Sequence, residues 1–546
     1  MTTKDPIPTS AARIPERTTA DHEVVVVGLG PVGGVAAGLL AREGLRVLAV
    51  EPLHEPYDKP RALGIDHEAL RTLQALGLGA ALEDCLGPYR TSEYRSADGQ
   101  VLRRIRPQPE PHPLSWPPYN TFIQPELESR IRASLAQWPN LEVRYGWKCV
   151  GITQDADGAS VDLVRVDGGE RHRTRCRYVV ACDGASSPVR ETAGLALEDL
   201  DFDEPWIVVD LLVNERAALP EVTIQYCDPA RPATYVEGPR NLRRWELMLL
   251  PGEDPAVMQA PAQIWKLLSP WITPDQGEIW RSATYRFHAL VCRQWRGGRV
   301  FLAGDAAHQT PPFMAQGMNQ GIRDAANLCW KLADVLRDRA APGLLDTYER
   351  ERRPNVHAVI ALTKRLGQII CERDPARAAA RDARLLAEMR AGTGDIVRQD
   401  LLPPLDDGFL MRDARGRLLP GVGRVFPQPM VECDGGVARM DDALGARWLL
   451  VGTSAWRPGT NARRLASRLD VVLACVDGDR DDDGDDDGDA RASGIKIVAE
   501  TSGLIRDWLA AHDVHAALVR PDHIVFGTAA GPGAQERLLA ALADAR

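Results

Sequence analysis

The chain has 546 residues, which is more than one ordinary hydrophobic core holds, so two or three domains are expected. Hydrophobic residues make up 44% of it, as in a globular protein, and nine aspartates and one arginine within residues 477–489 supply −8 of its net charge of −10. Because the rest of the chain is nearly neutral, the composition argues against nucleic acid and anionic lipid as partners and favours a small-molecule ligand.

Cysteine usage and the start of the sequence bear on the cellular compartment. The ten cysteines form no C-x-x-C pair, and the first twenty residues lack the apolar core of a signal peptide. We therefore expect a cytoplasmic protein with reduced thiols. No run reaches the roughly 18 to 20 apolar residues of a membrane span, so membrane insertion is not expected.

The N-terminal part of the chain predicts a disordered arm followed by a βαβ unit. Residues 1–22 are rich in proline, threonine and charge, which is typical of disorder. The apolar, β-branched run Val24–Val27 leads into a glycine turn, an Ala/Leu-rich helix that ends near Arg42 and a second strand at Arg46–Val50. This order of elements is the opening of a Rossmann-like domain.

The glycine turn matches a dinucleotide-binding fingerprint. Gly28 permits the tight turn, Gly30 lets the backbone approach a pyrophosphate, and Gly33 lets the helix meet the strand. The phosphates then lie at the helix N-terminus, and Glu51 at the end of the next strand accepts hydrogen bonds from ribose hydroxyls. The pattern by itself does not distinguish FAD from NAD.

Two stretches, about residues 92–120 and 200–295, alternate polar and apolar residues and predict a separate antiparallel sheet. Between and after them, strands are expected at Tyr178–Cys182 and Arg299–Ala303, which read as members of the first sheet. The second sheet is therefore expected to be inserted into a first domain that runs from residue 23 to residue 400.

The remaining chain predicts helices and then a compact α/β unit. A helical pattern runs from Ile322 to Arg398, with interruptions near Pro342 and Pro375, and a Pro/Gly/Asp-rich linker occupies residues 401–423. The last unit, 424–546, has predicted strands at 447–451, 471–476, 495–498 and 523–527 and predicted helices at 461–469, 504–512 and 534–545.

The acidic insert at residues 477–489 interrupts this unit. It repels itself and is expected to form a solvated loop. A calcium loop is disfavoured because the closing glutamate and the flanking helices are missing, and we expect no metal site.

Two further motifs each follow a predicted strand: Cys182–Arg190, which begins CDGASS, and Gly304–Gly321, which begins GDAAH and ends GMNQG. With the glycine turn, they resemble in kind and order the motifs of the class A flavoprotein monooxygenases, the family of p-hydroxybenzoate and phenol hydroxylases. The three motifs span about residues 23–365, and the resemblance also covers the C-terminal part, where ALVRPDHIVFG resembles the final strand of a thioredoxin-like domain. The resemblance implies an α/β fold with a Rossmann-like FAD-binding domain, an inserted antiparallel-sheet substrate domain and a C-terminal thioredoxin-like α/β domain.

Within that family, the stretches YDKPRALGIDHEALRTLQALGL, WIVVDL, YCDPARP and LLDTYERERR resemble the branch that acts on phenolic acids. The resemblance implies that NADH or NADPH reduces FAD, and that the flavin uses O2 to hydroxylate a phenolic acid in aromatic catabolism. The expected substrate is 3-(3-hydroxyphenyl)propionate or 3-hydroxycinnamate, with a 2,3-dihydroxy product.

The resemblance also assigns residues to the cofactor. Gly304 and Asp305 would bind FAD, with Asp305 at its ribityl chain, and Pro312 would lie beside the reactive edge of the isoalloxazine. Gly317, Met318 and Asn319 begin the next helix, whose N–H groups and dipole would stabilise negative charge on the reduced flavin.

Other assignments concern the loops around the cofactor. Arg61 and Gln124 match positions that contact FAD, and Asp183 matches a position tied to the pyrophosphate and to nicotinamide binding. Arg190 is a candidate for the phosphates of the nicotinamide cofactor, although a surface ion pair explains it equally well. No second nucleotide-binding unit is visible, so the nicotinamide cofactor is expected to bind transiently.

Candidate residues for substrate chemistry come from the inserted sheet. Tyr226 or His288 could take the phenol proton, as could Tyr235. Arg231 or Arg244 could pair with a substrate carboxylate. For each, an ordinary packed or solvated strand residue is the competing interpretation, and His308 is expected to be structural.

Three alternatives stay open at this stage. The enzyme could hydroxylate another phenol or tailor a polyketide, or the chain could be a non-catalytic FAD-binding scaffold.

Without a C-x-x-C pair, the thioredoxin-like domain cannot exchange dithiols, so it would be structural or lie at a subunit interface of a homo-oligomer.

Overall fold

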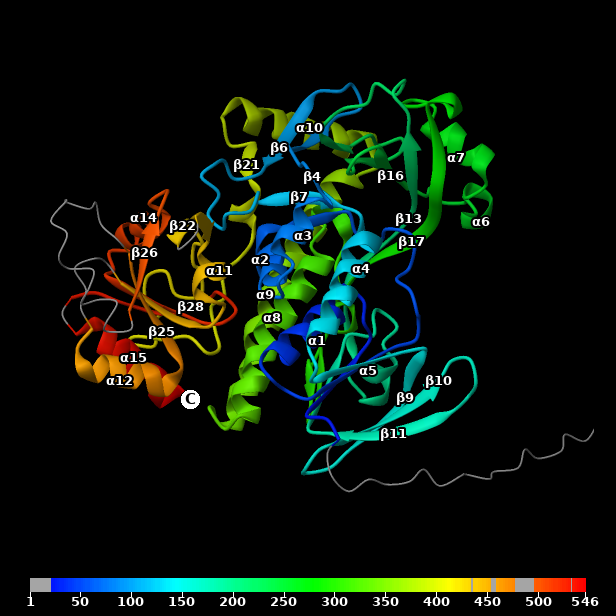
Figure 1. The fold of residues 1–546 in the computed structure, drawn as a ribbon. Helices are drawn as coiled ribbons and strands as arrows, with labels where there is room; N and C mark the ends of the chain where they lie inside the picture. Colours follow the sequence, from blue (N-terminus) through cyan, green and yellow to red (C-terminus); the bar gives the residue numbers. More distant parts are fainter. Residues whose placement is uncertain (1–20, 434–435, 453–457, 477–494, 532) are drawn as a thin grey trace, which may run out of the picture.

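The computed structural model describes residues 21–433, 436–452, 458–476, 495–531 and 533–546 (Figure 1). The predicted disordered arm, apart from its last two residues, and the predicted acidic loop at 477–489 lie outside the described residues. Within the described part, no helix is long and apolar enough to cross a membrane.

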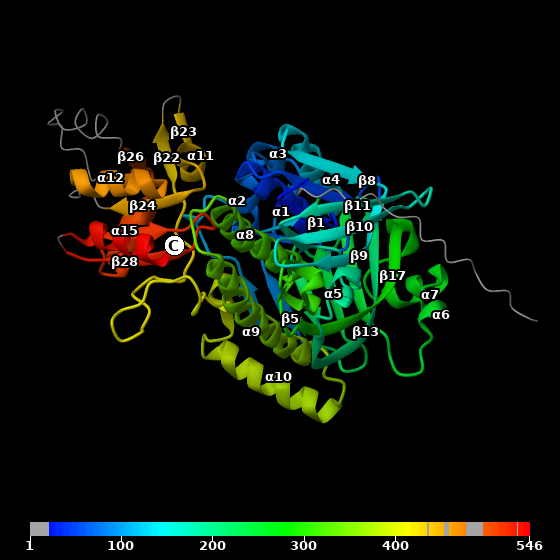
Figure 2. The same ribbon diagram turned by 90° about the horizontal axis from the view of Figure 1, so that it is seen from below.

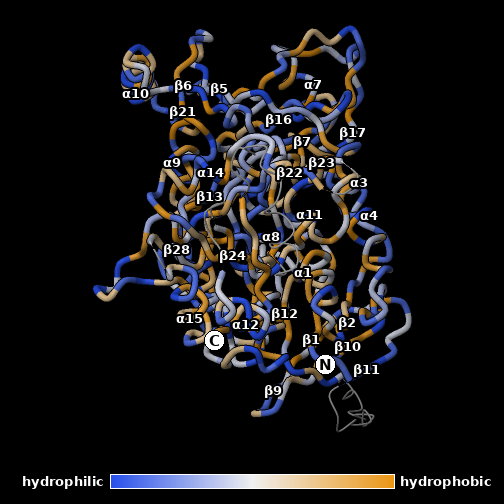
Figure 3. The backbone as a smooth tube through the Cα atoms, turned by 60° about the vertical axis from the view of Figure 1, so that its left-hand side comes forward, coloured by the Kyte–Doolittle hydropathy of each residue, from blue (hydrophilic) through white to orange (hydrophobic). Residues whose placement is uncertain are grey.

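The first sheet has six strands in the order β18-β19-β12-β1-β2-β8, and β1 pairs in parallel with both β12 and β2. Its strands are β18 (Arg296–Gly297), β19 (Val300–Leu302), β12 (Tyr178–Ala181), β1 (Val24–Val27), β2 (Val47–Glu51) and β8 (Leu141–Tyr145). The predicted βαβ unit is confirmed, with α1 at Pro31–Arg42. All four β1 valines are buried, and in Figure 3 β12 and β1 lie below α8, which is in the middle of the molecule.

The helix α1 packs against strands of this sheet, and two longer helices lie farther along the chain. The helix α8 (Gly317–Leu336) packs against α1, and α9 (Asp346–Ile370) continues the helical region that the sequence predicts. The helix α10 (Pro375–Arg390) follows, as expected from Pro375. The predicted helical region ends early, because β21 (Asp395–Val397) is a strand that pairs in parallel with β6 (Val101–Arg106).

The second large sheet has nine strands in the order β20-β17-β13-β16-β15-β14-β5-β6-β21. Its remaining strands are β20 (His308–Gln309), β17 (Gly277–Cys292), β13 (Leu197–Val213), β16 (Leu242–Met248), β15 (Ala233–Glu237), β14 (Thr223–Tyr226) and β5 (Ser92–Arg95). The predicted antiparallel sheet is mostly antiparallel, with two exceptions: β14 pairs in parallel with β5, and β6 pairs in parallel with β21. These connections come from chain segments far apart in sequence, which the alternation pattern does not reveal.

Strand alternation gives this sheet two different faces. Ile224, Tyr235 and Trp245 point to one face and form a hydrophobic cluster that also contains residues of α6 (Pro255–Met258) and α7 (Pro261–Leu268). Because successive side chains point to opposite faces, Gln225 and Glu246 point the other way, toward a cavity described below.

Smaller elements complete this part of the chain. A three-stranded antiparallel sheet contains β9 (Trp147–Gln154), β10 (Ala159–Arg165) and β11 (Arg171–Cys176), and another contains β3 (Gly64–Asp66), β7 (Tyr119–Phe122) and β4 (Leu86–Gly87). The short helices are α2 (His67–Gln74), α3 (Gly79–Glu83), α4 (Gln124–Ser134) and α5 (Pro188–Thr192). Asp66 caps α2 by accepting from the backbone N–H of Ala69 at 3.1 Å.

The C-terminal unit is built on a seven-stranded sheet in the order β23-β22-β26-β25-β24-β27-β28. Its elements are β22 (Met430–Cys433), β23 (Gly436–Arg439), α11 (Met440–Leu444), β24 (Trp448–Gly452), α12 (Thr460–Leu469), β25 (Val471–Val476), β26 (Lys496–Glu500), α14 (Leu504–Ala511), β27 (Ala516–Val519), β28 (Val525–Ala529) and α15 (Ala534–Ala545). The predicted strands and helices of this unit are confirmed. The sequence missed β22, β23 and β27, which are short.

The C-terminal unit lies against α2 and α8 of the rest of the chain (Figures 1 and 2). At this contact Arg71 of α2 donates to the Asp441 carboxylate of α11 at 2.6 and 2.9 Å, and both side chains are buried. A second buried cluster joins Glu351 of α9 to Arg520 at 2.7 Å. Because charged groups are rarely buried without partners, these pairs tie the two parts of the chain together specifically.

Candidate active site

A cavity of about 1110 Å³ lies between the six-stranded and the nine-stranded sheets. Gly28, Glu51, Asp183 and Asp305 line it, and these residues lie at or just beyond the carboxyl ends of β1, β2, β12 and β19. Ligands of open α/β sheets bind at this edge. The volume exceeds that of a usual small-molecule pocket, roughly 300 to 1,000 Å³, so the cavity accommodates a large ligand or two ligands at once.

The three glycines of the first motif play different parts. Gly28 has a φ of +91°, and a Cβ there would lie 2.5 Å from the Cys182 carbonyl oxygen. A Cβ on Gly33 would lie 1.9 Å from the Gly28 carbonyl oxygen, so both glycines are required by the fold. A Cβ on Gly30 would meet nothing within 4 Å, and Gly30 lines the cavity. Its missing side chain thus leaves room for a ligand to approach the backbone.

The carboxylates of Glu51 and Asp305 offer hydrogen-bond acceptors where the cavity meets the carboxyl ends of the strands. Glu51, the last residue of β2, accepts from the backbone N–H of Leu29 at 2.7 Å and of Leu53 at 3.0 Å. These bonds fix the position of its carboxylate. Asp305 faces the cavity and has no hydrogen-bond partner among the described residues. Desolvation by the surrounding protein raises the pKa of the Asp305 carboxyl, whose side chain is open to the cavity. Both acceptors suit a ligand with hydroxyl groups, as the predicted contact with a ribityl chain requires.

The N-terminus of α8 points backbone donors at the cavity. Gly317 and Met318 line it together with Pro312, and the first N–H groups of a helix have no partner within the helix. Asn319 does not reach the cavity: its side chain accepts from the Asp66 N–H at 3.1 Å and donates to the Gly64 carbonyl at 3.2 Å. Only its backbone can therefore serve the predicted role at the flavin.

Gln124 and Asp183 both shape loops at the cavity. Gln124 accepts from the backbone N–H groups of Arg61 and Ala62 at 3.0 and 2.8 Å, which holds that loop in place. Asp183 accepts from the Ser187 hydroxyl at 2.5 Å and from a backbone N–H of α5, and burial raises its pKa. Both residues line the cavity, as does Arg61.

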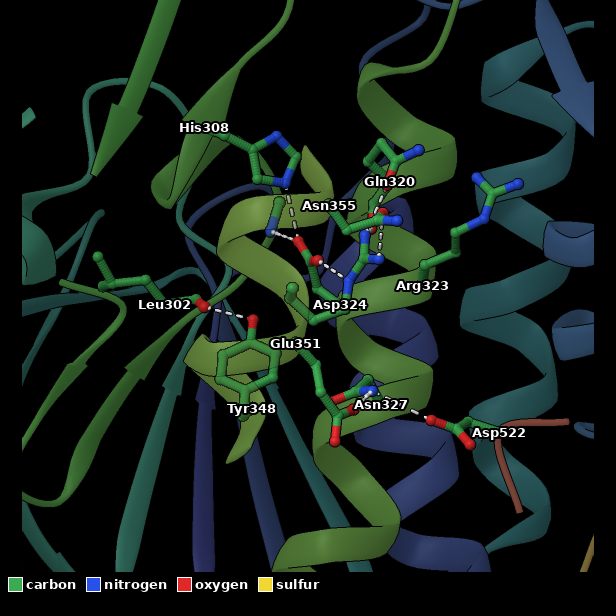
Figure 4. A network of polar contacts seen from close by, with 12 residues as sticks. Leu302, His308, Gln320, Arg323, Asp324, Asn327, Tyr348, Glu351, Asn355 and Asp522 are labelled. Carbon is green, nitrogen blue, oxygen red and sulfur yellow. Dashed lines mark hydrogen bonds and ion pairs between the residues drawn. The ribbon is translucent and has the colours of Figure 1, made fainter. Parts of the chain in front are cut away.

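Arg190, Gly304 and His308 of the second and third motifs form hydrogen bonds with other protein groups and do not line the cavity. Both interpretations of Arg190 are wrong, because its guanidinium is buried and donates to the carbonyls of Ala306 and Ala185 at 3.1 and 3.0 Å. Gly304, predicted to bind the cofactor, does not line the cavity and donates its N–H to Asp324. His308 contacts the same Asp324 at 2.8 Å and is fully buried, which confirms its structural role (Figure 4).

Three predicted substrate residues lie outside the cavity. Tyr226 packs against Trp271 with ring centroids 5.1 Å apart, and the Tyr235 hydroxyl donates to the Pro220 carbonyl at 2.9 Å. Arg231 pairs with Glu253 at 2.5 Å. These predictions are wrong because the two tyrosines occupy strand positions that face α6 and α7.

Arg244 and His288 do line the cavity. Arg244 is buried, binds both oxygens of Asp210 at 2.7 and 3.0 Å, and donates to the carbonyls of Pro60 and Arg61 at 2.7 and 2.8 Å. With its donors committed in this way, the predicted pairing of Arg244 with a substrate carboxylate is wrong. His288 lies at the rim, 3.6 Å from Asp203.

The sequence did not predict the side chains that line the rest of the cavity. On the nine-stranded sheet these include Thr223, Gln225, Thr234, Val236 and Glu246, and elsewhere in the lining they include Tyr89, Tyr119 and Arg398. Alternation along the strands at 223–226, 233–237 and 242–248 could have separated the cavity-facing residues from the tyrosines next to them. No sequence signal pointed to Arg398, which follows the unpredicted strand β21.

Two family models match the chain. One described as an FAD binding domain matches residues 21–363, and one described as the HcaD C-terminal domain matches residues 423–545. A probable NADH-specific resorcinol 4-hydroxylase of Rhodococcus jostii (strain RHA1) is 35% identical over 516 residues, 93% of this chain and 92% of that protein. The 3-(3-hydroxy-phenyl)propionate/3-hydroxycinnamic acid hydroxylase of Escherichia coli O139:H28 is 33% identical over 535 residues, again 93% and 92%.

Solved structures share the fold over nearly the whole chain. The flavin-dependent monooxygenase PieE in complex with FAD and substrate has a TM-score of 0.79 at 22% identity, with 96% of this chain and 99% of that one covered. Aklavinone-11 hydroxylase in complex with FAD and aklavinone has a TM-score of 0.74 at 24% identity, with the same coverage.

Proposed function

The chain belongs to the FAD-dependent monooxygenases, with FAD as its cofactor, and on that premise we propose that it hydroxylates a phenolic acid. The substrate class is that of 3-(3-hydroxyphenyl)propionate and 3-hydroxycinnamate, which give 2,3-dihydroxy products. Each turnover consumes one NAD(P)H, one proton and one O2. One oxygen atom becomes the new hydroxyl group, and the other leaves as water.

The proposal that the substrate is an acid rests on Arg398, whose buried guanidinium has no acidic partner among the described residues. Arg398 is 5% exposed and lines the cavity, and its guanidinium carbon lies 3.8 Å from the centroid of the Tyr119 ring. It donates to the Met314 carbonyl, and no carboxylate of the described residues lies within ion-pair distance. Because a buried charge without a counter-ion is costly, the arrangement favours a ligand that brings a carboxylate.

FAD, when bound, takes hydride from the nicotinamide cofactor and activates O2 for transfer to the ring. The residues that fit it are the open backbone at Gly30, the acceptors Glu51 and Asp305, and the donors at the start of α8. The helix dipole and free N–H groups at Gly317 and Met318 stabilise negative charge beside them.

Aromatic side chains close one side of the cavity against water. Phe313, which follows Pro312, packs edge-on against Phe202, Trp206 and Phe287, with ring centroids 5.8 to 6.1 Å apart. A dry, rigid wall at this point favours oxygen transfer over loss of the activated oxygen to solvent.

If Arg398 binds the substrate carboxylate, its replacement should lower kcat/KM for a charged phenolic acid far more than for an uncharged phenol. In Arg398→Met, the apolar stem keeps the packing on the tyrosine rings but removes the charge. We expect kcat/KM for 3-(3-hydroxyphenyl)propionate to fall about 100-fold, the value of a lost charged hydrogen-bond pair, mainly through KM. For uncharged phenols such as resorcinol, we expect less than about a threefold change.

The matched control is Arg106→Met, which removes a guanidinium that is 54% exposed on the neighbouring strand β6. It should leave both substrates unaffected. Equal losses for charged and uncharged phenols in Arg398→Met would contradict carboxylate binding. A wild-type preference for resorcinol would instead favour the activity named for the Rhodococcus relative.

A further inference from the structure

Glu246 is a buried carboxylate that faces the cavity without a partner. It lies on β16, is 8% exposed and lines the cavity. Its carboxylate forms no hydrogen bond or ion pair with any residue in the described parts of the chain. A carboxylate in such a position costs free energy unless a ligand satisfies it.

The nearest charges are already paired with one another. Arg244, two residues away on the same strand, and Arg281 of β17 both bind Asp210 of β13, at 2.7 and 3.4 Å. Both arginines also donate to the Pro60 carbonyl. Arg244 and Asp210 are the charged groups whose fields act on Glu246, and they act in opposite directions. Glu246 is therefore not the counter-ion of this cluster.

A row of polar side chains continues from Glu246 across the sheet. Glu246 is opposite Thr234 on β15, and Thr234 is opposite Gln225 on β14. The Thr234 hydroxyl donates to the Gln225 side-chain oxygen at 2.6 Å, which leaves the Gln225 amide N–H groups to donate elsewhere. All three side chains line the cavity. An acceptor on β16 and a donor on β14 thus flank Thr234 of β15 on the same face of the sheet.

We propose that Glu246 is a catalytic residue that accepts the proton of the substrate's phenolic hydroxyl. The phenol O–H bond breaks, the proton bonds to a carboxylate oxygen of Glu246, and the electron pair stays on the substrate, where it makes the ring more electron-rich. The inference rests on the proposed phenol hydroxylation, but it requires only the hydroxyl group of the substrate and not its carboxylate.

Burial also suits Glu246 to this role. It raises the pKa of the Glu246 carboxyl, which brings it closer to that of a phenol and makes the carboxylate a stronger base. The carboxylate must be ionised to accept the proton, so activity should rise with pH as Glu246 loses its own proton. The phenol, with a pKa of about 10, ionises unaided only at much higher pH.

The test compares wild type with Glu246→Gln, both loaded with FAD, on the phenol that wild type hydroxylates fastest. We expect kcat to fall about 100- to 1,000-fold at pH 7, the usual contribution of a general base, with KM changed less than about threefold. The defect should shrink as pH rises toward 9 and with fluorinated phenols of lower pKa, since an ionised substrate needs no base. A purely structural role would produce neither rescue.

Two further variants complete the design. Glu246→Asp keeps a carboxylate and should retain more activity than Glu246→Gln, and Glu237→Gln removes a carboxylate of the same sheet that does not line the cavity. A Glu246→Gln enzyme that matches wild type, or whose defect is the same at every pH, would overturn the role of Glu246. If wild type hydroxylates no phenol, the proposed function fails instead.

Discussion

Gly30→Val is expected to leave the chain folded and to weaken its affinity for FAD at least 100-fold, or about 2.7 kcal/mol. Gly30 has a φ of −63°, which any residue adopts, and its absent side chain meets no protein atom within 4 Å. The apo-protein should therefore keep its melting temperature. The added methyl groups would instead occupy the space that the cofactor's pyrophosphate takes at the start of α1.

FAD affinity is measured by titration of apo-protein and followed by the change in flavin fluorescence. Gly343→Val is the matched control, since Gly343 also has open space around it but lies away from the cavity. Gly33→Ala should behave differently and yield little folded protein, because its Cβ would lie 1.9 Å from a backbone oxygen. Unchanged FAD affinity in Gly30→Val would mean that the pyrophosphate lies elsewhere.

Glu351→Gln is expected to destabilise the protein by about 3 to 5 kcal/mol, the cost of breaking a buried charge cluster from one side. Glu351 is fully buried and binds Lys331 at 2.9 Å and Arg520 at 2.7 Å. It also accepts from Asn327 at 2.6 Å, and Figure 4 shows both side chains in the interior beside Asp522. A neutral amide would leave the buried cations Lys331 and Arg520 without a full counter-charge. For a chain of 546 residues, the melting temperature should then fall by about 3 to 4 °C.

The destabilisation caused by Glu351→Gln should be smaller at low pH than at neutral pH. Burial alone would raise the pKa of Glu351, but Arg520 and Lys331 hold it at about 2. Its contribution is therefore present above the ordinary pKa of about 4.3 and is lost as pH falls from there toward 2. The difference in melting temperature between wild type and Glu351→Gln should shrink over that range. Asp346→Asn, an exposed change on the same helix, should cost less than about 1 kcal/mol.

Much of the cofactor end of the cavity could be predicted from the sequence, because its backbone geometry requires particular residue types, above all glycine. Gly28 and Gly33 are required by contacts within the fold, and each predicted motif follows a buried parallel strand. Asp305 was assigned through the resemblance of its motif to the flavoprotein monooxygenases, and it lines the cavity. The motifs did not reveal which of their members turn inward, as Asn319 and Arg190 do.

The substrate end could not be predicted in the same way. On β14, β15 and β16, a shift of one position exchanges the cavity face for the core face, so Tyr226 and Tyr235 were chosen where Gln225 and Thr234 line the cavity. Arg398 reaches the cavity through β21, whose pairing with β6 joins segments about 290 residues apart. Long-range pairings of this kind are set by tertiary packing, which local patterns do not encode.

The most direct test of the account is NADH or NADPH consumption by the FAD-loaded protein with and without 3-(3-hydroxyphenyl)propionate, with the product identified by mass spectrometry. We expect substrate-stimulated oxidation of the nicotinamide cofactor and a product heavier by one oxygen atom, a catechol. Failure to oxidise either cofactor with any of a panel of phenols and phenolic acids would contradict the hydroxylase function and favour a non-catalytic flavoprotein.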